Sequence, residues 1–513
     1  MISFNDEIHA TMYLTLNKSI KYKFALPLLL GVLSGCAQKN FYADTQVQNP
    51  IVYQQLQKGN TSIDSVMVAA GPHYKRGAFY NFLWGTRHRN AWTAPVTVPV
   101  LHPDTVKGGL TIEKTGGGMQ TIKATMVSGN GKVYALRSVD KRPELHLPSI
   151  LKRSFAADIT LDQTSALNPY AALVVAPLAK ASGIPSPSPK LYYARPNEVR
   201  FGKYKDLLSD RLYMLEEKLD DKRSLTGSLA GAHDVLDTKE MLANYYAHQN
   251  HFIDQLAYAK ARLFDLLIGD RDRHEDQWEW AAFREDDHVV YRPIPKDRDN
   301  AFFRFDDGVL SWLLSRKWTN RKFESFDGKY RDVKALMLKS EYLDSRALTA
   351  VTAQQYDSLA RVLQSKLTDE VIRYAVNQLP PSVYAIQGQN LEQNLRSRRN
   401  DLHKAAHKFY TILSEEIVIR GTEKSDYFKL TRLSDNETRL TISGDTNGKV
   451  TYQRTFNRTN TKKIRIEALG GDDVLEISGK ARKGIKVFFS GGPGEDKVID
   501  HSQGKVKRIV VQD

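Results

Sequence analysis

Cys36 is the only cysteine in this 513-residue chain. One copy of the chain therefore cannot form a disulfide, and no metal site can be built from several thiolates. The folded state must be held together by buried apolar surface, for which 41% of the residues are hydrophobic. By length, we expect about three domains with separate cores.

The N-terminal region has the pattern of an export signal. A basic stretch ends at Lys23 and leads into the apolar run 24–33, which is too short to span a bilayer permanently. Leu33-Ser34-Gly35-Cys36 follows and resembles the lipobox of bacterial lipoproteins. The resemblance implies removal of residues 1–35, a lipid on Cys36, and a protein anchored in the cell envelope, at the outer membrane. The alternative is an ordinary secretory signal with a chance cysteine.

The formal net charge is +15 at pH 7. Such a balance favours anionic partners, for example lipid headgroups, nucleotides or a charged envelope polymer. We expect membrane contact through the lipid and an envelope polymer or protein as substrate. We expect no nucleic-acid partner, because of the envelope location rather than the charge.

Composition divides the first half of the chain in two. Residues 36–70 are rich in Gln, Asn and Thr without a lasting apolar period, which predicts a polar tether with some helical content. Residues 71–240 read as a mixed α/β lobe. Its predicted elements are strands at 96–100 and 110–112, a hairpin at 122–127 and 133–139 around Asn130-Gly131, a helix at 169–181, and strands at 190–193 and 211–216.

The hydrophobic pattern of the sequence changes twice in the second half of the chain. Residues 241–413 have mostly helical spacing, with one helix ending at Gly269 and others expected at 308–315, 331–338, 352–377 and 391–413. Residues 414–513 read as short alternating strands between Gly and Asp turns, typical of a separate β domain. The predicted fold class is α+β, with a kinase-like core of two lobes followed by an all-β domain.

Two acidic loops flank a short strand at 289–291. The first begins where an apolar helix stops and contains Asp272, His274 and Gln277; the second contains Asp297 and Asp299. Phosphoryl transfer requires such a set: one carboxylate for the acceptor hydroxyl, and an amide with a second carboxylate for Mg²⁺. The alternative is a solvated salt-bridge network, since Arg and Asp alternate here.

Asp272-Arg273-His274-x-x-Gln277 resembles the catalytic loop of atypical kinases, namely the phosphoinositide-kinase-like, HipA-like and secreted Golgi enzymes. The resemblance implies Asp272 and His274 as catalytic residues and ATP with Mg²⁺ or Mn²⁺ as cofactors. Metal ligands would be Gln277, which replaces the usual Asn, and Asp299, with Asp297 as its alternate. A pseudokinase that keeps the fold without turnover is also consistent with Gln277.

The N-terminal lobe offers candidates for nucleotide binding. Gly116, Gly117 and Gly118 precede a hairpin, where backbone amides could approach phosphates, although a P-loop lysine is missing. Arg137 stands where kinases have their strand lysine, and Lys141 follows four residues on. Either side chain could neutralise the phosphates.

Three acidic residues complete the expected lobe. Glu216 lies in Leu215-Glu216-Glu217, which looks like a hinge between kinase lobes. Asp158 or Asp162 could supply the acidic partner of the basic residue. None of these three assignments rests on a specific motif.

A second resemblance covers nearly all the chain from Gly71 onward. Tyr74-Lys75-Arg76, the 116–121 and 136–141 segments, and Asp270-Arg271-Asp272-Arg273-His274 look like the region that follows the phosphoesterase domain in envelope proteins known as calcineurin-like metallophosphoesterases. The dimetal domain itself is missing, because the sequence contains no Gly-Asn-His motif. The resemblance therefore implies a phosphoesterase-associated protein, without that catalytic domain.

The β domain contains Gly491-Gly492-Pro493-Gly494-Glu495-Asp496-Lys497-Val498-Ile499, which fits the nonapeptide of calcium-binding β-rolls. A shorter copy starts at Gly470. The copies are separated by whole strands, so we interpret Asp472, Asp473 and Asp496 as turn residues of a β-sandwich or short β-solenoid. Bound Ca²⁺ is the alternative.

The segment 74–92 is aromatic and basic. We expect a lid packed over the mixed lobe; the alternative is an anion or glycan contact through Arg76, Arg87 and Arg89. For the whole chain, the sequence favours a lipid-anchored, kinase-like phosphotransferase that acts on a hydroxyl acceptor. The alternatives are a non-catalytic, pseudokinase-like scaffold and a phosphoesterase-associated protein.

Overall fold

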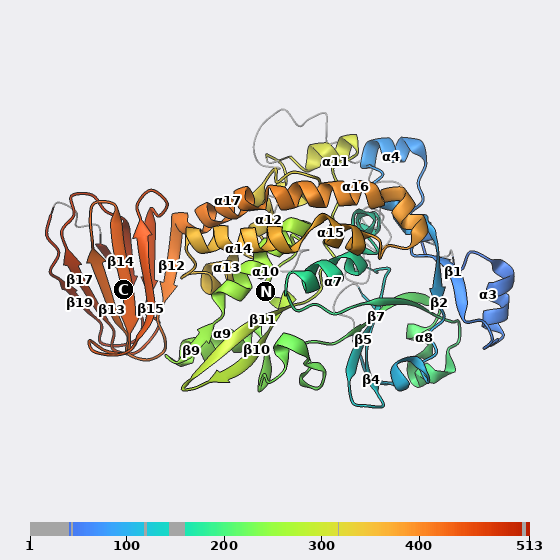
Figure 1. Ribbon diagram of the computed structural model, residues 1–513, viewed down its shortest axis with the longest axis horizontal. Helices are drawn as coiled ribbons and strands as arrows, with labels where there is room; N and C mark the ends of the chain where they lie inside the picture. Colours follow the sequence, from blue (N-terminus) through green and yellow to red (C-terminus); the bar gives the residue numbers. More distant parts are fainter. Residues whose placement is uncertain are drawn as a thin grey trace, which may run out of the picture.

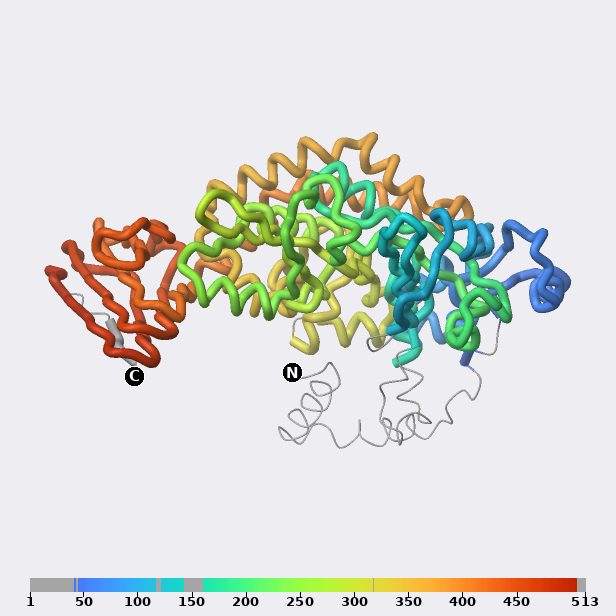
Figure 2. The backbone as a smooth tube through the Cα atoms, turned by 90° about the horizontal axis from the view of Figure 1, so that it is seen from below, coloured from blue at the N-terminus to red at the C-terminus, as the bar shows by residue number. Residues whose placement is uncertain are grey.

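The computed structural model describes residues 41–42, 45–116, 121–142, 160–316, 318–504 and 509–512. The predicted signal peptide, Cys36, Gly117, Gly118 and Asp158 lie outside these residues. The molecule is elongated: two N-terminal sheets lie at one end, the β domain lies at the other, and a helical region lies between them (Figures 1 and 2). In the described part of the chain, no helix has both the length and the apolarity to cross a bilayer.

The C-terminal part of the predicted tether is folded. Helix α3 (Pro50–Gln57) is capped by the side chain of Asn49, and strand β1 (Ser65–Ala69) pairs antiparallel with β2 (Pro95–Pro99). Leu56, Val66 and Val68 are buried in the main core. The tether prediction is therefore wrong for residues 45–70, because a few widely spaced apolar side chains suffice to dock this segment.

A five-stranded antiparallel sheet forms the mixed lobe, in the order β3-β4-β5-β7-β6. The predicted hairpin around Asn130-Gly131 is confirmed, and Leu136, Tyr213 and Leu215 contribute to the core of this sheet. Short helices α4 (Ala78–Trp84) and α5 (Arg89–Thr93) precede the sheet, and α7 (Ala171–Ala181) lies between its third and fourth strands in sequence. The strands are β3 (Leu110–Gly116), β4 (Lys123–Ser128), β5 (Val133–Ser138), β6 (Lys190–Ala194) and β7 (Arg211–Glu217).

Helix α10 (Gln255–Ile268) is the centre of the second lobe. Asp254 caps its N-terminus, and Gly269 ends it in the left-handed region at φ 68°. A four-stranded sheet packs beside it, in the order β8-β10-β11-β9, of which only the segment 289–291 is predicted from sequence. Its strands are β8 (Asp234–Asp237), β9 (His251–Ile253), β10 (Trp278–Glu285) and β11 (His288–Pro295).

Two of the predicted long helices are each divided. The segment 352–377 forms two helices because the Thr368 side chain accepts a hydrogen bond from the Val371 N–H and starts a new helix. The segment 391–413 belongs to two helices that meet at Asp401. The remaining helices of this lobe are α9 (Thr238–Ala247), α11 (Val309–Leu314), α12 (Val333–Met337), α13 (Glu341–Ala347), α14 (Ala353–Lys366), α15 (Asp369–Val376), α16 (Pro381–Asn400) and α17 (Leu402–Glu415).

The β domain has its own core and is a short solenoid. Lys463 pairs in parallel with Lys486, and Val474 with Lys497, so these turns are offset by 23 residues. The first turn is offset by 47 residues, because Glu416 pairs with Lys463 and an antiparallel hairpin at 437–457 is inserted. One sheet has the order β12-β16-β18-β20, and the other has the order β15-β14-β13-β17-β19. The strands are β12 (Glu416–Arg420), β13 (Tyr427–Arg432), β14 (Glu437–Ser443), β15 (Val450–Asn457), β16 (Lys463–Glu467), β17 (Val474–Gly479), β18 (Lys486–Ser490), β19 (Lys497–Asp500) and β20 (Ile509–Gln512).

Aspartates at equivalent turns of the solenoid are linked from one turn to the next. The Asp473 carboxylate accepts a hydrogen bond from the Asp426 N–H (2.7 Å), and Asp496 accepts one from the Asp473 N–H (2.9 Å). Asp472 likewise accepts one from the Glu495 N–H. These contacts support the interpretation as turn residues. The Ca²⁺ expectation receives no support, because no group of three or more His, Cys, Asp or Glu in the described segments is placed to hold a metal.

The buried Asp473 makes the stability of the solenoid dependent on pH. Burial, with the nearby charges of Asp426, Asp496 and Asp472, raises the pKa of Asp473 to about 7. An unfolded aspartate titrates near pH 4, so the folded state binds the extra proton between about pH 4 and 7, and stability falls as the pH rises through this window. We expect Asp473→Asn to leave the acceptor in place and to stabilise the domain at pH 8 by about 1–2 kcal/mol, but not at pH 4. Calorimetric unfolding at both pH values measures this difference.

Asp472→Asn is the matched control, because it makes the same chemical change one residue earlier at an exposed side chain. We expect that variant to unfold like the wild type at both pH values. Equal stability of Asp473→Asn and the wild type at pH 8 would contradict the assignment.

Candidate active site

The β10–β11 hairpin brings the two acidic loops together. Trp278 at the start of β10 pairs with Pro295 at the end of β11, so the loop before the hairpin and the loop after it lie at the same edge. The Lys296 N–H donates to the Gln277 carbonyl (3.0 Å), and the Arg273 guanidinium donates to the Lys296 carbonyl (2.5 Å). The two loops therefore lie at one edge of the hairpin, because the unpredicted strand β10 runs antiparallel to β11.

A single buried carboxylate on α10 positions both loops. Asp265 pairs with Arg273 of the first loop at 3.2 Å and with Arg298 of the second at 3.1 Å, and also with Arg262 of its own helix. Asp265 and Arg273 have no exposed surface, and Arg273 also lies over the Trp278 ring. The alternating Arg and Asp residues of the first loop therefore form partly buried ion pairs rather than a solvated salt-bridge network.

Asp272 points away from these ion pairs and is ionised. Its two carboxylate oxygens accept hydrogen bonds from the Lys339 ammonium (2.7 Å) and the Asn300 side-chain amide (3.2 Å). Burial alone would raise the pKa of Asp272, but the charge and hydrogen bond of Lys339 outweigh burial and hold that pKa below its usual value. Asn300 links the two loops, because it belongs to the second and binds Asp272 of the first.

Arg137 on β5 joins the two lobes. Its guanidinium pairs with Glu216 on the neighbouring strand β7 (3.2 Å) and with Asp299 (3.1 Å) and Asp297 of the second acidic loop. The Lys141 ammonium also pairs with Asp299, at 2.9 Å. Three carboxylates and two cations thus meet where the lobes face each other.

Burial and charge act in opposite directions on this cluster. Burial disfavours the charged form of Arg137, but Asp297, Asp299 and Glu216 overcome it and raise the pKa of Arg137. Burial raises the pKa of Glu216, an effect that Arg137 only partly offsets. Burial would also raise the pKa of Asp297, but Arg137 and Lys141 hold it well below its usual range. The second loop therefore presents ionised carboxylate at neutral pH.

A pocket opens at the cluster, between the mixed lobe and the lobe that contains the β10–β11 hairpin. Its charged wall consists of Arg137, Lys141, Glu216, Lys296, Asp297, Arg298 and Asp299. Small-molecule sites usually combine a few convergent polar groups with apolar surface of this kind. The apolar wall includes Val139, Leu167, Ala171, Val175 and Met214.

Several predicted site residues have other positions than expected. Glu216 is the acidic partner of Arg137 instead of a hinge contact, and Asp162 is not that partner. Gly116 ends strand β3, where it pairs with Lys123. The Gln277 amide lies 3.3 Å from His274, and neither side chain lines the pocket described above. The sequence analysis missed two residues that bind Asp272, Asn300 and Lys339. Asn300 directly follows the predicted Asp299 and could have been found, but no local signal marks Lys339.

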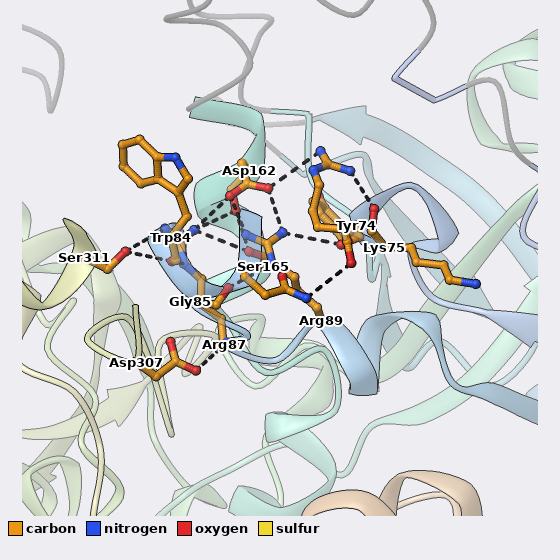
Figure 3. Close-up of polar contacts among 12 residues, drawn as sticks. Tyr74, Lys75, Trp84, Gly85, Arg87, Arg89, Asp162, Ser165, Asp307 and Ser311 are labelled. Carbon is orange, nitrogen blue, oxygen red and sulfur yellow. Dashed lines mark hydrogen bonds and ion pairs between the residues drawn. The ribbon is translucent and has the colours of Figure 1, made fainter. Parts of the chain in front are cut away.

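Asp162 instead binds the basic residues of the lid. Arg89 makes two hydrogen bonds to its carboxylate, at 2.6 and 2.7 Å, and Arg87 and Arg76 approach the same carboxylate (Figure 3). Arg87 and Arg89 are buried. These two arginines are therefore packed inside the fold and are not available to an anion or a glycan, whereas α4 of the same segment has no buried residue.

Asp297 and Asp299 fit one kind of metal site. Mg²⁺ is commonly held by one or two carboxylates together with substrate phosphates, rather than by a complete set of protein ligands. The two aspartates supply that number, and no larger group of His, Cys, Asp and Glu is placed for a metal within the described ranges. Both aspartates are paired with Arg137 or Lys141, so a metal would have to compete with these cations.

No protein family model matches the chain, and no curated protein matches it. Solved structures do match at low identity. The Helicobacter pylori proinflammatory kinase CtkA is 13% identical over 58% of this chain and 95% of its own, with a TM-score of 0.33. The Rio2 kinase from Chaetomium thermophilum in complex with ADP, Mg²⁺ and phosphoaspartate is 12% identical over 66% and 84%, with a TM-score of 0.27. The Golgi casein kinase with Mn and ADP is 11% identical over 71% and 94%, with a TM-score of 0.24. All three are kinases, but the resemblance is remote, so the functional case rests on the contacts of this chain.

Removal of Arg137 should destabilise the core. Arg137→Met leaves Glu216, Asp297 and Asp299 close together without their main cation, and we expect a loss of about 2–4 kcal/mol at pH 7. The loss should shrink at low pH, where the carboxylates are protonated and need no cation. Urea denaturation at pH 7 and pH 4.5 measures both effects.

Lys190→Met is the matched control, because it removes a cation from an exposed position of the same sheet. We expect a change within about 0.5 kcal/mol. An equally small effect of Arg137→Met at pH 7 would mean that the inter-lobe cluster does not contribute to stability.

Proposed function

We propose that the pocket between the lobes binds ATP with Mg²⁺ or Mn²⁺ and that the protein transfers a phosphoryl group to a hydroxyl acceptor. The observation that carries the proposal is the position of Arg137. It lies between Glu216 of its own lobe and Asp297 and Asp299 of the opposite lobe. A phosphoryl-transfer site needs this combination of cations for phosphates and carboxylates for metal at one place.

The two cations and the two aspartates have separate roles in this proposal. Arg137 and Lys141 bind the phosphates, which would replace the aspartates as their partners. Asp297 and Asp299 are thereby released to hold the metal, whose positive charge neutralises charge that develops on the phosphates during transfer. The apolar wall formed by Val139, Val175 and neighbouring side chains contacts the base.

Asp272 orients the acceptor hydroxyl. Its carboxylate is ionised, and Lys339 and Asn300 fix its orientation. Because the pKa of Asp272 is lowered, it is a weak base. A weak base takes the proton late, when the bond to phosphorus is already forming. Asp272 therefore acts first as a hydrogen-bond acceptor and then as the proton acceptor. We assign no proton transfer to His274.

The site would act in the cell envelope. The lipobox-like sequence at Cys36 supports a lipid-anchored protein at the outer membrane, and the net charge of +15 supports an anionic envelope polymer or a protein as acceptor. Nucleic acid is not proposed as a partner. A phosphoesterase-associated role rests on the sequence resemblance alone.

A second candidate is a pseudokinase-like scaffold that binds a ligand without turnover. The pairing of Asp297 and Asp299 with Arg137 and Lys141 favours it, because a cleft held closed by its own charges needs no metal. Gln277 also lies away from the pocket.

Calorimetric titration of the full chain with Mg-ATP and Mn-ATP tests the proposal. We expect Asp299→Asn to weaken the binding of either complex by about tenfold or more, because one metal ligand loses its charge. We expect Asp272→Asn to bind with an affinity within about threefold of the wild type, but to lose about 100-fold or more of any phosphoryl transfer.

Asp276→Asn serves as the control, because Asp276 is in the first acidic loop but its side chain is 83% exposed. It should bind and react like the wild type. Failure of the wild-type chain to bind either complex would rule out the nucleotide site. Binding without turnover would select the scaffold.

A further inference from the structure

Two short helices at one edge of the molecule leave large apolar side chains in solvent. Helices α4 and α11 lie side by side there, beyond α16 (Figure 1). Phe79 on α4 is 76% exposed, and Trp318, which follows α11, is 72% exposed. Large apolar side chains gathered in solvent on two adjacent helices are typical of an interaction site. We call it the apolar face; it includes Phe79, Phe82, Val309, Trp312, Leu313 and Trp318.

The underside of the apolar face is closely packed. Gly85 follows α4, Gly308 precedes α11, and a Cβ atom on Gly308 would collide with the backbone nitrogen of Gly85. The Arg87 N–H donates to the Asp307 carboxylate at 2.7 Å (Figure 3). The two helices therefore meet through their backbones, and a larger residue at Gly308 could not be accommodated without a shift.

Polar side chains fix the same contact from below. The Ser311 hydroxyl of α11 donates to the Trp84 carbonyl at the end of α4 (2.7 Å), and Arg87 donates to the Asp162 carbonyl (Figure 3). Asp162 also holds Arg89, as described above. Both helices are held through their inner sides. Their outer, apolar side chains are therefore exposed because of how the helices pack, and not because the packing is loose.

The chemistry of the face matches a lipid surface. Trp and Phe beside Lys and Arg are typical of surfaces that bind the interface of a bilayer. The sequence from Gly308 to Lys322 contains four Lys or Arg residues and no Asp or Glu. Two of the four are paired with acidic residues outside this stretch, Arg316 with Asp306 and Arg321 with Asp332. The Arg316 guanidinium lies 4.6 Å from the centre of the Trp312 ring, so charge and apolar surface are adjacent. Anionic headgroups would complement this stretch.

The N-terminal end of the described chain lies beside the face. The Arg76 guanidinium lies over the Phe41 ring, 5.5 Å from its centre, and Arg76 is two residues before α4. Phe41 is five residues after Cys36, so covalent geometry allows at most about 18 Å between them. A lipid on Cys36 would therefore enter a bilayer within reach of the face.

We propose that the apolar face docks on an anionic lipid bilayer. The bilayer receives the aromatic side chains of α4 and α11 at the headgroup boundary, and the basic residues after α11 contact its phosphates. Stable anchoring usually takes two signals, and the face supplies the second where Cys36 carries a lipid. The docking is independent of catalysis and stands whether or not the inter-lobe pocket binds ATP.

Vesicle binding of the full chain tests the proposal, in the wild type and with Cys36→Ser to remove the lipid site. We expect Phe79→Ser combined with Trp312→Ser to weaken binding of the Cys36→Ser chain to phosphatidylglycerol-containing vesicles by about tenfold or more. Vesicles of phosphatidylcholine alone should bind less. Brominated lipids should quench tryptophan fluorescence, and Trp312→Phe with Trp318→Phe should remove most of that quenching.

Tyr374→Ser combined with Ile386→Ser is the matched control, because these side chains are 63% and 46% exposed on α15 and α16. The apolar run 24–33 is common to all variants, so only differences between them count. Two results would overturn the proposal: vesicle binding unchanged by the face variant, or no quenching at Trp312 and Trp318. A concentration-dependent dimer that the face variant abolishes, without any vesicle binding, would instead assign the face to a second copy.

Discussion

The buried carboxylate of Asp265 is the contact on which the site depends. It lies on α10, the central helix, and holds Arg273 of the first acidic loop and Arg298 of the second. One carboxylate with several guanidinium groups is costly to bury, and the ion pairs of Asp265 with Arg262, Arg273 and Arg298 offset part of that cost. The two loops are consequently fixed to one helix and to each other before any ligand binds. This arrangement thereby fixes the positions of Asp272 and Asp299.

The inter-lobe cluster is balanced so that it suits a metal–phosphate pair better than either ion alone. With Glu216 ionised, the three carboxylates with Arg137 and Lys141 carry one net negative charge. Lys296 and Arg298 also line the pocket, but they are paired with Glu279 and Asp265 outside it. A divalent cation alone or a phosphate dianion alone would change the charge of the pocket by two, whereas the two together add no net charge, which low-dielectric surroundings favour.

Local signals predicted many elements of this fold, but not strands β8, β9 and β10 and not the contacts between elements. The Asn130-Gly131 hairpin and the end of α10 at Gly269 follow from turn and cap chemistry, which acts over a few residues. The two acidic loops follow from a polar pattern beside a strand. Lys339 is 67 residues from Asp272, and Glu216 is 79 residues from Arg137, and nothing near either residue marks the pairing. Such contacts depend on how whole elements pack, so only the folded chain reveals them.

The β domain is joined to the helical lobe through the same turns that build the solenoid. Asp426 accepts a hydrogen bond from the Gln249 side chain of the lobe (2.8 Å), while its own N–H donates to Asp473 of the next turn. Tyr452 of the domain donates to the Thr349 carbonyl (2.9 Å). One hydrogen bond thus links Asp473 to Asp426, the residue that contacts the helical lobe.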